Sequence, residues 1–536
     1  MSRRLFLLLP LALAGCDLAP HYRRPAPMIP SQFSQGPAYP ALGAGGDVAA
    51  IGWRRFFTDP RLATVIGMSL AHNQDIQLAL ATIAQARAQY RIQRADLFPT
   101  LGVAASASGR RTASNGASAG ISGSGLTGST GTAGTGVTTG TTGTGTSTGT
   151  GTGGTSGSGS LIGATTGTAA GRTIETYGLT ATIASWEIDL FGRIRNLSRA
   201  ALDQYLATRA ARDATQISLI AEVATAWLTL ASDQDQLRLS RETRAAYAES
   251  LRITRAQFTR GVVSELDVRQ ADTAFQSARA DVAQRTSQIA QDQNALNLLA
   301  GTTVPAALLP AALGEAQPTL ADLPAGLDSG VLLNRPDVIQ AEDQLRAENA
   351  NIGAARAAFF PSISLTAAAG TASGGLAGLF AGGSWSWNAS GSVVQTLFDF
   401  GRRRAELRYA EASRDAAVAR YRQAVQTAFR DVSDALAVRG TIAEQIAAQG
   451  ARVVSARRAA LLSDARYRAG IDPYLTALDT QRTAYAAEQT LASTRLARAT
   501  NLVTLYTALG GGLRPDDGAA DTGSAPAPAP RAPGAQ

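Results

Sequence analysis

Few residues of this 536-residue chain could carry out covalent or metal chemistry. The chain holds one cysteine, Cys16, and two histidines, His21 and His72. A disulfide within the chain is therefore impossible, a Cys/His metal site is not expected, and no nucleophile stands beside a suitable base. All the basic residues are arginine, so the Gly-Lys pair of a phosphate-binding loop is absent. We expect no catalytic site, no metal and no cofactor, and any energy must come from a partner.

Cys16 stands where an export signal would be cut. Met1–Gly15 has two arginines and then a short apolar run, and it ends in Leu13-Ala14-Gly15-Cys16. The run is too short to span a bilayer and is typical of a secretory signal peptide. Its end resembles a bacterial lipoprotein box, so we expect a covalent lipid on Cys16. An ordinary signal peptide with a chance cysteine is the alternative.

The residues after this cysteine are also informative. In some bacteria an aspartate directly after the lipidated cysteine, here Asp17, resembles a signal that retains a lipoprotein in the inner membrane. We expect a membrane barrel to override that signal. The segment 16–52 is rich in Pro and Gly, and we expect it to be an extended strap.

The helical part of the sequence occurs twice. A helix is predicted over Arg402–Tyr467 and a second over Tyr474–Leu509, and an earlier stretch repeats both. Apolar residues on these helices step by three and four positions, as in coiled coils. The sequence therefore predicts two long helical hairpins in register. The glycines that mark the repeat are Gly192, Gly261 and Gly301 in the first copy and, 209 residues later, Gly401, Gly470 and Gly510 in the second.

Each hairpin follows a shorter helix and two strand-like stretches. The shorter helices are predicted at about 60–97 and 331–360, and we expect each to stack end to end on the return helix of its hairpin. After Pro99 and Pro361 alternate residues become apolar, in stretches of about ten residues. This pattern is typical of strands of a membrane β-barrel, with Trp385 and Trp387 suited to the interfacial girdle. A soluble β-hairpin is the alternative.

A tract of Gly, Thr and Ser, residues 112–171, lies between the first two strand-like stretches. It has no charged and no aromatic residue. Such a composition buries too little apolar surface to offset the entropy lost on ordering, so we expect a disordered extracellular loop. An adhesive segment is the alternative.

Composition limits the remaining classes. The net charge is +8, but arginines are interspersed with acids along the helices, whereas nucleic-acid binding requires clustered charge. No apolar run of 18 or more residues follows residue 15, so no transmembrane helix is expected. We expect a mainly α, internally duplicated protomer with four membrane β-strands. Its parts are a signal peptide (1–15), a lipid-anchored strap (16–52), a first repeat (53–301), a connector (302–330), a second repeat (331–510) and a disordered tail (511–536).

Several motifs are similar to those of TolC-like outer-membrane factors, in the lipoprotein (NodT-like) branch that serves tripartite, RND-type efflux pumps. The likeness covers roughly Cys16 to Gly510 in both halves, and the Gly/Thr/Ser tract departs from it. The motifs are Trp53…Phe57-x-Asp59-Pro60…Asn73-x-Asp75, Asn334-Arg-Pro-Asp-Val338-x-x-Ala341-Glu342, Phe359-Phe-Pro-Ser-Ile363, Leu397-Phe398-Asp399-Phe400-Gly401 and Tyr467-x-x-Gly470…Leu475-x-x-Leu478-Asp479.

The resemblance implies a passive exit duct in the outer membrane. A homotrimer would take substrates from an inner-membrane pump and a periplasmic adaptor and release them outside. Each chain would give four strands to a shared barrel in outer-membrane lipid and its helices to a shared periplasmic tunnel. Four strands cannot close on themselves, and lipid does not tolerate an open sheet edge, which agrees with a barrel shared between copies.

The resemblance also places function at the turns of the two hairpins. The second hairpin would supply a periplasmic gate, formed by Leu475, Asp479 and Arg482 on one helix face. Three Asp479 side chains near a threefold axis would repel one another unless Arg482 pairs with them; an exposed ion pair within the helix is the alternative. Thr476 stands where some members carry a second acid. The tip residues implied in adaptor docking are Gly261, Val262, Ser264, Leu266, Gly470, Ile471 and Asp472.

Two other functions stay open on the sequence alone. One is a type I protein-secretion conduit on the same fold, which a neighbouring peptide exporter would favour. The other is a structural or adhesive surface lipoprotein that uses the Gly/Thr/Ser tract, and it would lose its role if the tract were deleted. The substrate cannot be named.

Overall fold

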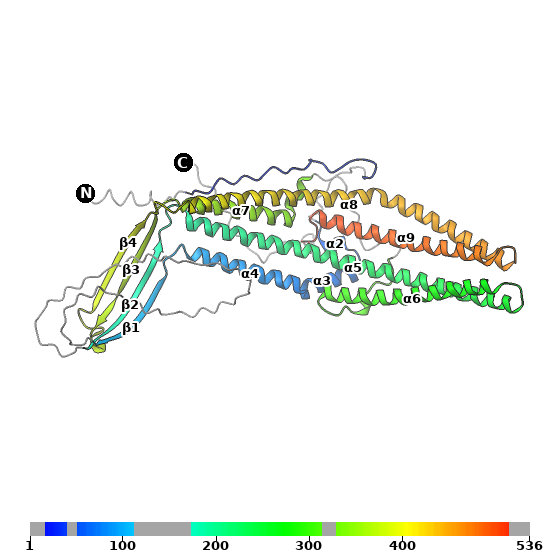
Figure 1. Cartoon of the computed structure of the whole chain (residues 1–536), viewed down its shortest axis with the longest axis horizontal. Helices are drawn as coiled ribbons and strands as arrows, with labels where there is room; N and C mark the ends of the chain where they lie inside the picture. Colours follow the sequence, from blue (N-terminus) through cyan, green and yellow to red (C-terminus); the bar gives the residue numbers. More distant parts are fainter. Residues whose placement is uncertain (1–16, 40–50, 112–172, 314–328, 514–536) are drawn as a thin grey trace, which may run out of the picture. The chain divides into compact units, whose positions relative to one another are not determined.

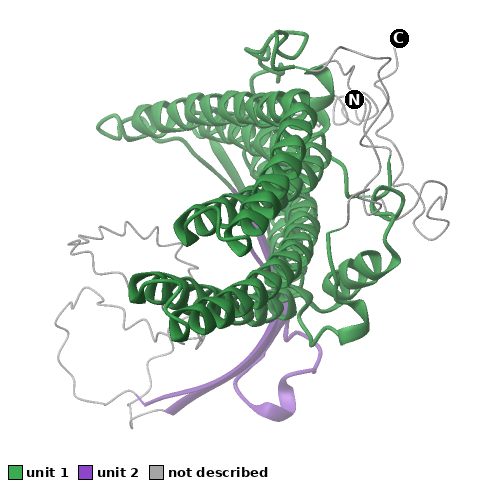
Figure 2. Cartoon of the chain, turned by 90° about the vertical axis from the view of Figure 1, so that its right-hand side faces the viewer, with its two compact units in different colours: residues 1–99, 187–364, 392–536 green, residues 100–186, 365–391 purple. Residues whose placement is uncertain are grey.

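A computed structural model describes residues 17–39, 51–111, 173–313 and 329–513. The expected signal peptide, Cys16, the Gly/Thr/Ser tract and the chain beyond 513 lie outside the described residues. Long helices and one sheet make up the described chain (Figure 1). The chain divides into two compact units, unit 1 (1–99, 187–364 and 392–536) and unit 2 (100–186 and 365–391), which Figure 2 shows in green and purple.

The elements follow one another twice in nearly the same order. The first half contains α2 (Trp53–Phe56), α3 (Pro60–His72), α4 (Gln74–Ala95), β1 (Leu101–Arg111), β2 (Thr173–Glu187), α5 (Arg193–Thr259) and α6 (Glu265–Ala300). The second half contains α7 (Pro336–Ala357), β3 (Ser362–Ser373), β4 (Trp385–Val394), α8 (Arg402–Arg468) and α9 (Tyr474–Ala508). Short 3-10 turns are η2 (Ala306–Leu308), η3 (Ser329–Asn334) and η4 (Leu376–Gly378). Helices α5 and α8 have 67 residues each, and α4 and α7 have 22 each. The predicted duplication is confirmed.

The glycines of the repeat stand where the chain enters or leaves a long helix. All six have positive φ, a backbone conformation that costs other L-residues roughly 1–2 kcal/mol. Glycine has no side chain to clash there, so it fits at each of these ends. The φ values are 78° and 85° at Gly192 and Gly401, 73° at both Gly261 and Gly470, and 68° and 82° at Gly301 and Gly510.

Each short helix continues the line of a return helix. Helix α4 begins at the end of α6, where Asn73 Nδ2 donates to the Leu299 carbonyl at 3.0 Å. In the second half Arg335 Nη1 donates to the Ala508 carbonyl at 2.7 Å, at the junction of α7 and α9. Asn73 and Arg335 hold equivalent positions in the repeat, and so do Leu299 and Ala508. Different side chains therefore satisfy the same free carbonyl at a helix C-terminus.

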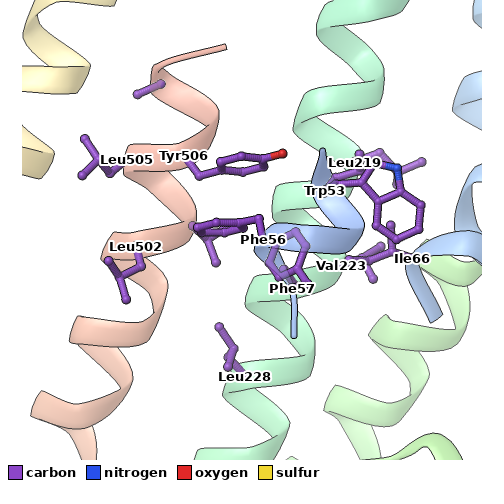
Figure 3. Packing of buried hydrophobic residues seen from close by; sticks show 14 of the residues in the cluster. Trp53, Phe56, Phe57, Ile66, Leu219, Val223, Leu228, Leu502, Leu505 and Tyr506 are labelled. Atoms are coloured by element: carbon purple, nitrogen blue, oxygen red, sulfur yellow. The ribbon is translucent and has the colours of Figure 1, made fainter. Parts of the chain in front are cut away.

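The largest hydrophobic cluster packs α2 and α3 against α5 and α9 (Figure 3). The rings of Phe56 and Tyr506 stack with 3.9 Å between their centroids, Phe57 lies beside them, and Trp53 is also buried. Asp59 then caps α3 by accepting from the backbone N–H of the second helical residue. The motif that begins at Trp53 thus supplies aromatic side chains to the core, and its Asp59 then caps the start of α3.

Helix α5 contains an 18-residue window that is apolar enough to cross a membrane, by length and composition only. No such helix was expected from the sequence. Of that window, 56% is buried inside the protein. Packing against neighbouring helices therefore accounts for its apolar character.

The four strands form one sheet in the order β1-β2-β3-β4, so β1 and β4 are its edges among the described strands. Strands β1 and β2 are antiparallel. Their register pairs the residues that were predicted to alternate as apolar, which places these pairs on one face. The pairs are Leu101 with Ile183, Val103 with Ala181, Ala105 with Leu179 and Ala107 with Tyr177. On β4, Trp385 and Trp387 are exposed.

Candidate functional site

The turns that end α5 and α8 have the same structure. The N–H of Val262 donates to the Gln257 carbonyl at 3.0 Å, and the N–H of Ile471 donates to the Arg466 carbonyl at 2.9 Å. These bonds, with the left-handed glycine before each donor, close a helix C-terminus by satisfying its free carbonyls. The repeat thus builds one hairpin tip twice.

Each tip exposes two apolar side chains at equivalent positions. Val262 and Leu266 are 68% and 65% exposed in the first tip, and Ile471 and Leu475 are 63% and 55% exposed in the second. Covering apolar surface is favourable by roughly 25 cal/mol per Å². Clustered apolar side chains at the end of a hairpin are therefore suited to bind a partner.

The polar tip residues hold the turns in shape. Ser264 caps α6 in a capping box with Asp267: the Ser264 hydroxyl lies 2.7 Å from an Asp267 carboxylate oxygen, which also accepts from the Ser264 N–H at 3.0 Å. In the second tip Asp472 accepts two hydrogen bonds from Arg466, at 2.6 and 2.8 Å. The hydrogen bonds from Arg466 lower the pKa of Asp472. Ser264 and Asp472 therefore shape the backbone that presents the apolar side chains.

The three residues implied in the gate lie on α9, just after the second tip. Leu475, Asp479 and Arg482 are all exposed, and their spacing puts them on one helix face. No ion pair joins Asp479 to Arg482 in the part of the chain that the structure describes. The other side of the same turns is buried, with Tyr474 and Leu478 packed against the first hairpin. The Asp479 face is thus left for contacts beyond this chain.

Only the second hairpin carries charges at these three positions. In the first hairpin the repeat places Leu266, Gln270 and Thr273 at the positions of Leu475, Asp479 and Arg482. The apolar residue is kept and both charges are replaced by neutral side chains. The two hairpins therefore share the tip but not the charged face.

A contact between the hairpins, which was not predicted from the sequence, lies behind the tips. The Tyr467 hydroxyl donates to Gln257 Oε1 at 2.7 Å and lies 3.0 Å from the Thr254 hydroxyl. Burial raises the pKa of Tyr467, so the hydroxyl stays protonated. Its ring packs edge to face against Tyr474, with 5.3 Å between centroids. The equivalent residue of the first copy is Phe258, so the second copy has an additional hydroxyl at this position. That difference between the copies is the sequence signal from which the contact could have been predicted.

Metal and histidine chemistry has no support in the described residues. No group of three or more His, Cys, Asp or Glu could hold a metal ion there. His21 lies in the strap, and His72 lies at the end of α3 with Nδ1 2.9 Å from the Met68 carbonyl oxygen. The tips thus combine exposed apolar side chains with one charged helix face.

Known proteins match this chain along nearly its whole length. A family model described as outer membrane efflux protein matches residues 65–302 and 328–511. The toluene efflux pump outer membrane protein TtgC of Pseudomonas putida is 41% identical, over 95% of both chains. The cation efflux system protein CusC of Escherichia coli is 37% identical, over 94% of this chain and 97% of its own. The open state of the Neisseria gonorrhoeae MtrE outer membrane channel matches with a TM-score of 0.75 at 32% identity, covering 94% of this chain and 100% of that one.

Proposed function

The chain belongs to the outer membrane efflux protein family, and from that premise we propose how it serves as the exit duct of an efflux system. We propose that three copies form one gated channel and that Cys16 carries its lipid anchor. We further propose that the hairpin tips dock a periplasmic adaptor, which connects the channel to an inner-membrane pump. The named relatives are a toluene exporter component and a cation exporter component, so selectivity is assigned to the pump and no substrate to this chain.

The open sheet supports an assembly of several copies. Strands β1 and β4 each leave one edge without a partner among the described strands. In lipid each unpaired backbone group costs several kcal/mol, so both edges need a neighbour. Pairing β4 of each copy with β1 of the next, around a closed ring, satisfies both edges of every copy. The helices of unit 1 lie in a curved layer (Figure 2), which copies around an axis would complete as a tunnel.

The observation that carries the docking proposal is the repeated apolar pair at the tips. Val262 with Leu266, and Ile471 with Leu475, are exposed at equivalent positions. Exposing four large apolar side chains to water is unfavourable unless a partner covers them. An adaptor that meets both tips of each copy would find the same small surface repeated around the channel.

The exposed charges of the second hairpin are the observation that supports the proposed gate. Asp479 and Arg482 make no ion pair with each other in the described chain, so both are available to neighbouring copies. Two like charges 4 Å apart repel by about 4 kcal/mol at the effective dielectric constant of a protein surface. Pairing of Asp479 with Arg482 across copies would offset that repulsion and hold the constriction closed.

The test is the single-channel conductance of the purified protein in planar bilayers, wild type beside Asp479→Ala. We expect a small conductance in the wild type and a larger one in the variant, because the variant loses the pairing that closes the constriction. Gln270→Ala, at the equivalent position of the first hairpin, is the matched control and should leave the conductance unchanged.

The outcomes separate the parts of the proposal. Equal conductance in Asp479→Ala and wild type would remove Asp479 from the gate but leave the duct intact. An increase in Gln270→Ala as well would mean that any loosening of the hairpins opens the channel. The absence of channels in every variant would contradict the duct itself.

A further inference from the structure

The strap follows helix α7 in a fixed register. Three side chains of α7, each seven residues from the next, bind every second residue of the strap. Seven residues span about two helical turns, so the three side chains lie on one face of α7. Arg356 donates to the Leu18 carbonyl (3.4 Å), Asn349 donates to the Pro20 carbonyl (2.7 Å), and Glu342 accepts from the Tyr22 hydroxyl (3.1 Å).

Asp17, the first described residue of the strap, is bound by side chains of α5. Arg199 Nη1 pairs with one carboxylate oxygen of Asp17 at 2.6 Å. The other oxygen accepts from Asn196 Nδ2 at 3.2 Å and from the Ala19 N–H at 3.1 Å. Partial burial alone would raise the pKa of Asp17, but these three donors outweigh burial and lower it. The carboxylate is therefore ionised, and both of its oxygens are occupied.

Close packing keeps the strap in this place. A Cβ atom added at Gly353 of α7 would lie 2.8 Å from the Ala19 Cβ and 2.7 Å from Asn196 Nδ2. Real Cβ atoms essentially never approach other atoms so closely. Glycine at 353 thus lets the strap and Asn196 reach α7, and a larger residue there must displace them.

We propose that pairing with Arg199 and docking of the strap, rather than burial, keep the 49% exposed Asp17 from the machinery that retains Cys-Asp lipoproteins in the inner membrane, so that the folded chain is released to the outer membrane. This inference rests on the proposed lipidation of Cys16. On this proposal the machinery recognises the carboxylate beside the acylated cysteine only when its charge is unpaired and its segment is free of α7. The folded chain instead neutralises the charge with Arg199 and holds the next residues on α7. An unfolded chain offers the free carboxylate.

The test uses the full-length chain in a Gram-negative host chosen because it retains a reporter lipoprotein that begins Cys-Asp. Inner and outer membranes are separated on a density gradient, and the chain is quantified in each. Arg199→Ala frees Asp17 and should move most of the chain to the inner membrane. The double variant Arg199→Ala/Asp17→Ser should return it to the outer membrane, and Asp17→Ser alone should stay there.

Two further variants test whether a folding defect, rather than the free Asp17, explains retention in the inner membrane. Gly353→Ala displaces the strap without touching Arg199 and should also cause retention that Asp17→Ser relieves. Arg193→Ala, which removes a cation of the same helix that pairs with Glu187, should stay in the outer membrane. If the double variants remain in the inner membrane like the single ones, misfolding rather than Asp17 explains the retention and the inference is wrong.

Labelling with a radioactive fatty acid in the same cells separates this inference from the proposed anchor. If the wild-type chain takes up no label, the lipid on Cys16 is wrong and the inference falls with it. If the chain is labelled but Arg199→Ala reaches the outer membrane like the wild type, the anchor stands and only the proposed effect of pairing Asp17 is refuted.

Discussion

A few substitutions between the two copies distinguish their roles. Tyr467 replaces Phe258 and adds one hydroxyl, which binds Gln257 of the other hairpin. Asp479 replaces Gln270 and adds one charge on an exposed face. A hydrogen bond of this kind contributes about 1 kcal/mol, enough to bias a hairpin between two positions without locking it. The second hairpin is thus held by the first and carries the charges proposed for the gate.

A partly buried acid, Asp203, gives the helical unit a pH dependence. Burial, with the neighbouring charge of Asp343, raises the pKa of Asp203 to about 6. The folded chain therefore binds this proton more tightly than the unfolded chain, whose value is 3.8. Stability from protonation is complete below the unfolded value and is lost as the pH rises through about 6.

We therefore expect Asp203→Asn to stabilise the protein at neutral pH, by at most about 3 kcal/mol. The gain should shrink as the pH falls from 7.5 towards 4, because wild-type Asp203 becomes neutral there. The measurement is the thermal midpoint of detergent-solubilised protein at both ends of this range. Asp213→Asn, which removes an acid of the same helix with a 40% exposed side chain, is the control and should change little. A gain of equal size at both pH values would show that charge is not its cause.

The junctions between elements are where the repeat is most constrained. Each is a glycine with positive φ, but the two return helices end in different surroundings. A Cβ atom at Gly301 would lie 2.5 Å from the His72 carbonyl oxygen, whereas one at Gly510 would lie 3.8 Å from the Arg335 side chain. The His72 backbone at the first junction cannot move aside, whereas the Arg335 side chain at the second junction can.

Gly301→Ala should therefore destabilise the protein more than Gly510→Ala. Both variants bear the same backbone strain of roughly 1–2 kcal/mol, and only Gly301→Ala adds a clash between the end of α6 and the start of α4. Thermal unfolding followed by circular dichroism, on the two variants in parallel, measures the difference. Equal midpoints would mean that α3 and α4 shift freely and that the end-to-end junction is not rigid.

For the molecule as a whole, the tips should matter for assembly and not for conduction. Val262→Asp with Ile471→Asp places charges in the proposed docking surface. Burying a valine or isoleucine stabilises by about 1.5–3 kcal/mol, so we expect the dissociation constant for the adaptor to rise at least about tenfold. Titration of purified adaptor onto the immobilised channel measures it, with Leu298→Asp, a 78% exposed residue at the other end of α6, as control.

The same double variant should keep the wild-type conductance in planar bilayers. Altered conductance would assign the tips to the gate, and unchanged adaptor affinity would remove them from the docking surface.

The Gly/Thr/Ser tract should be dispensable for transport. Deleting 112–171 removes residues that lie outside both hairpins and all four strands. We expect conductance and efflux to survive the deletion, measured in bilayers and by substrate resistance of a strain that lacks its own duct. A loss of cell-surface adhesion with intact conductance would assign the tract a separate role, whereas loss of conductance would make it part of the channel.

The sequence by itself determined the helices, helix ends and strands, which depend on near neighbours along the chain. Heptad steps predicted α5 and α8, glycines predicted the helix ends, and alternation predicted which residues of β1 and β2 are the apolar ones, although not how they pair. The aromatic motif around Trp53 predicted the start of a helical region, although the packing of its side chains in the core was not evident. These patterns are readable because helix, strand and turn preferences act over a few residues.

Only the tertiary structure decided which distant side chains meet. Tyr467 binds Gln257 210 residues away, Arg335 caps α9 across 173 residues, and Asp17 binds Arg199 across 182. Such contacts depend on how helices pack and on where a glycine such as Gly353 permits close approach, and one sequence carries no periodic signal for them. The tip and the strand were therefore predictable, whereas the contact between hairpins and the site that holds Asp17 were not.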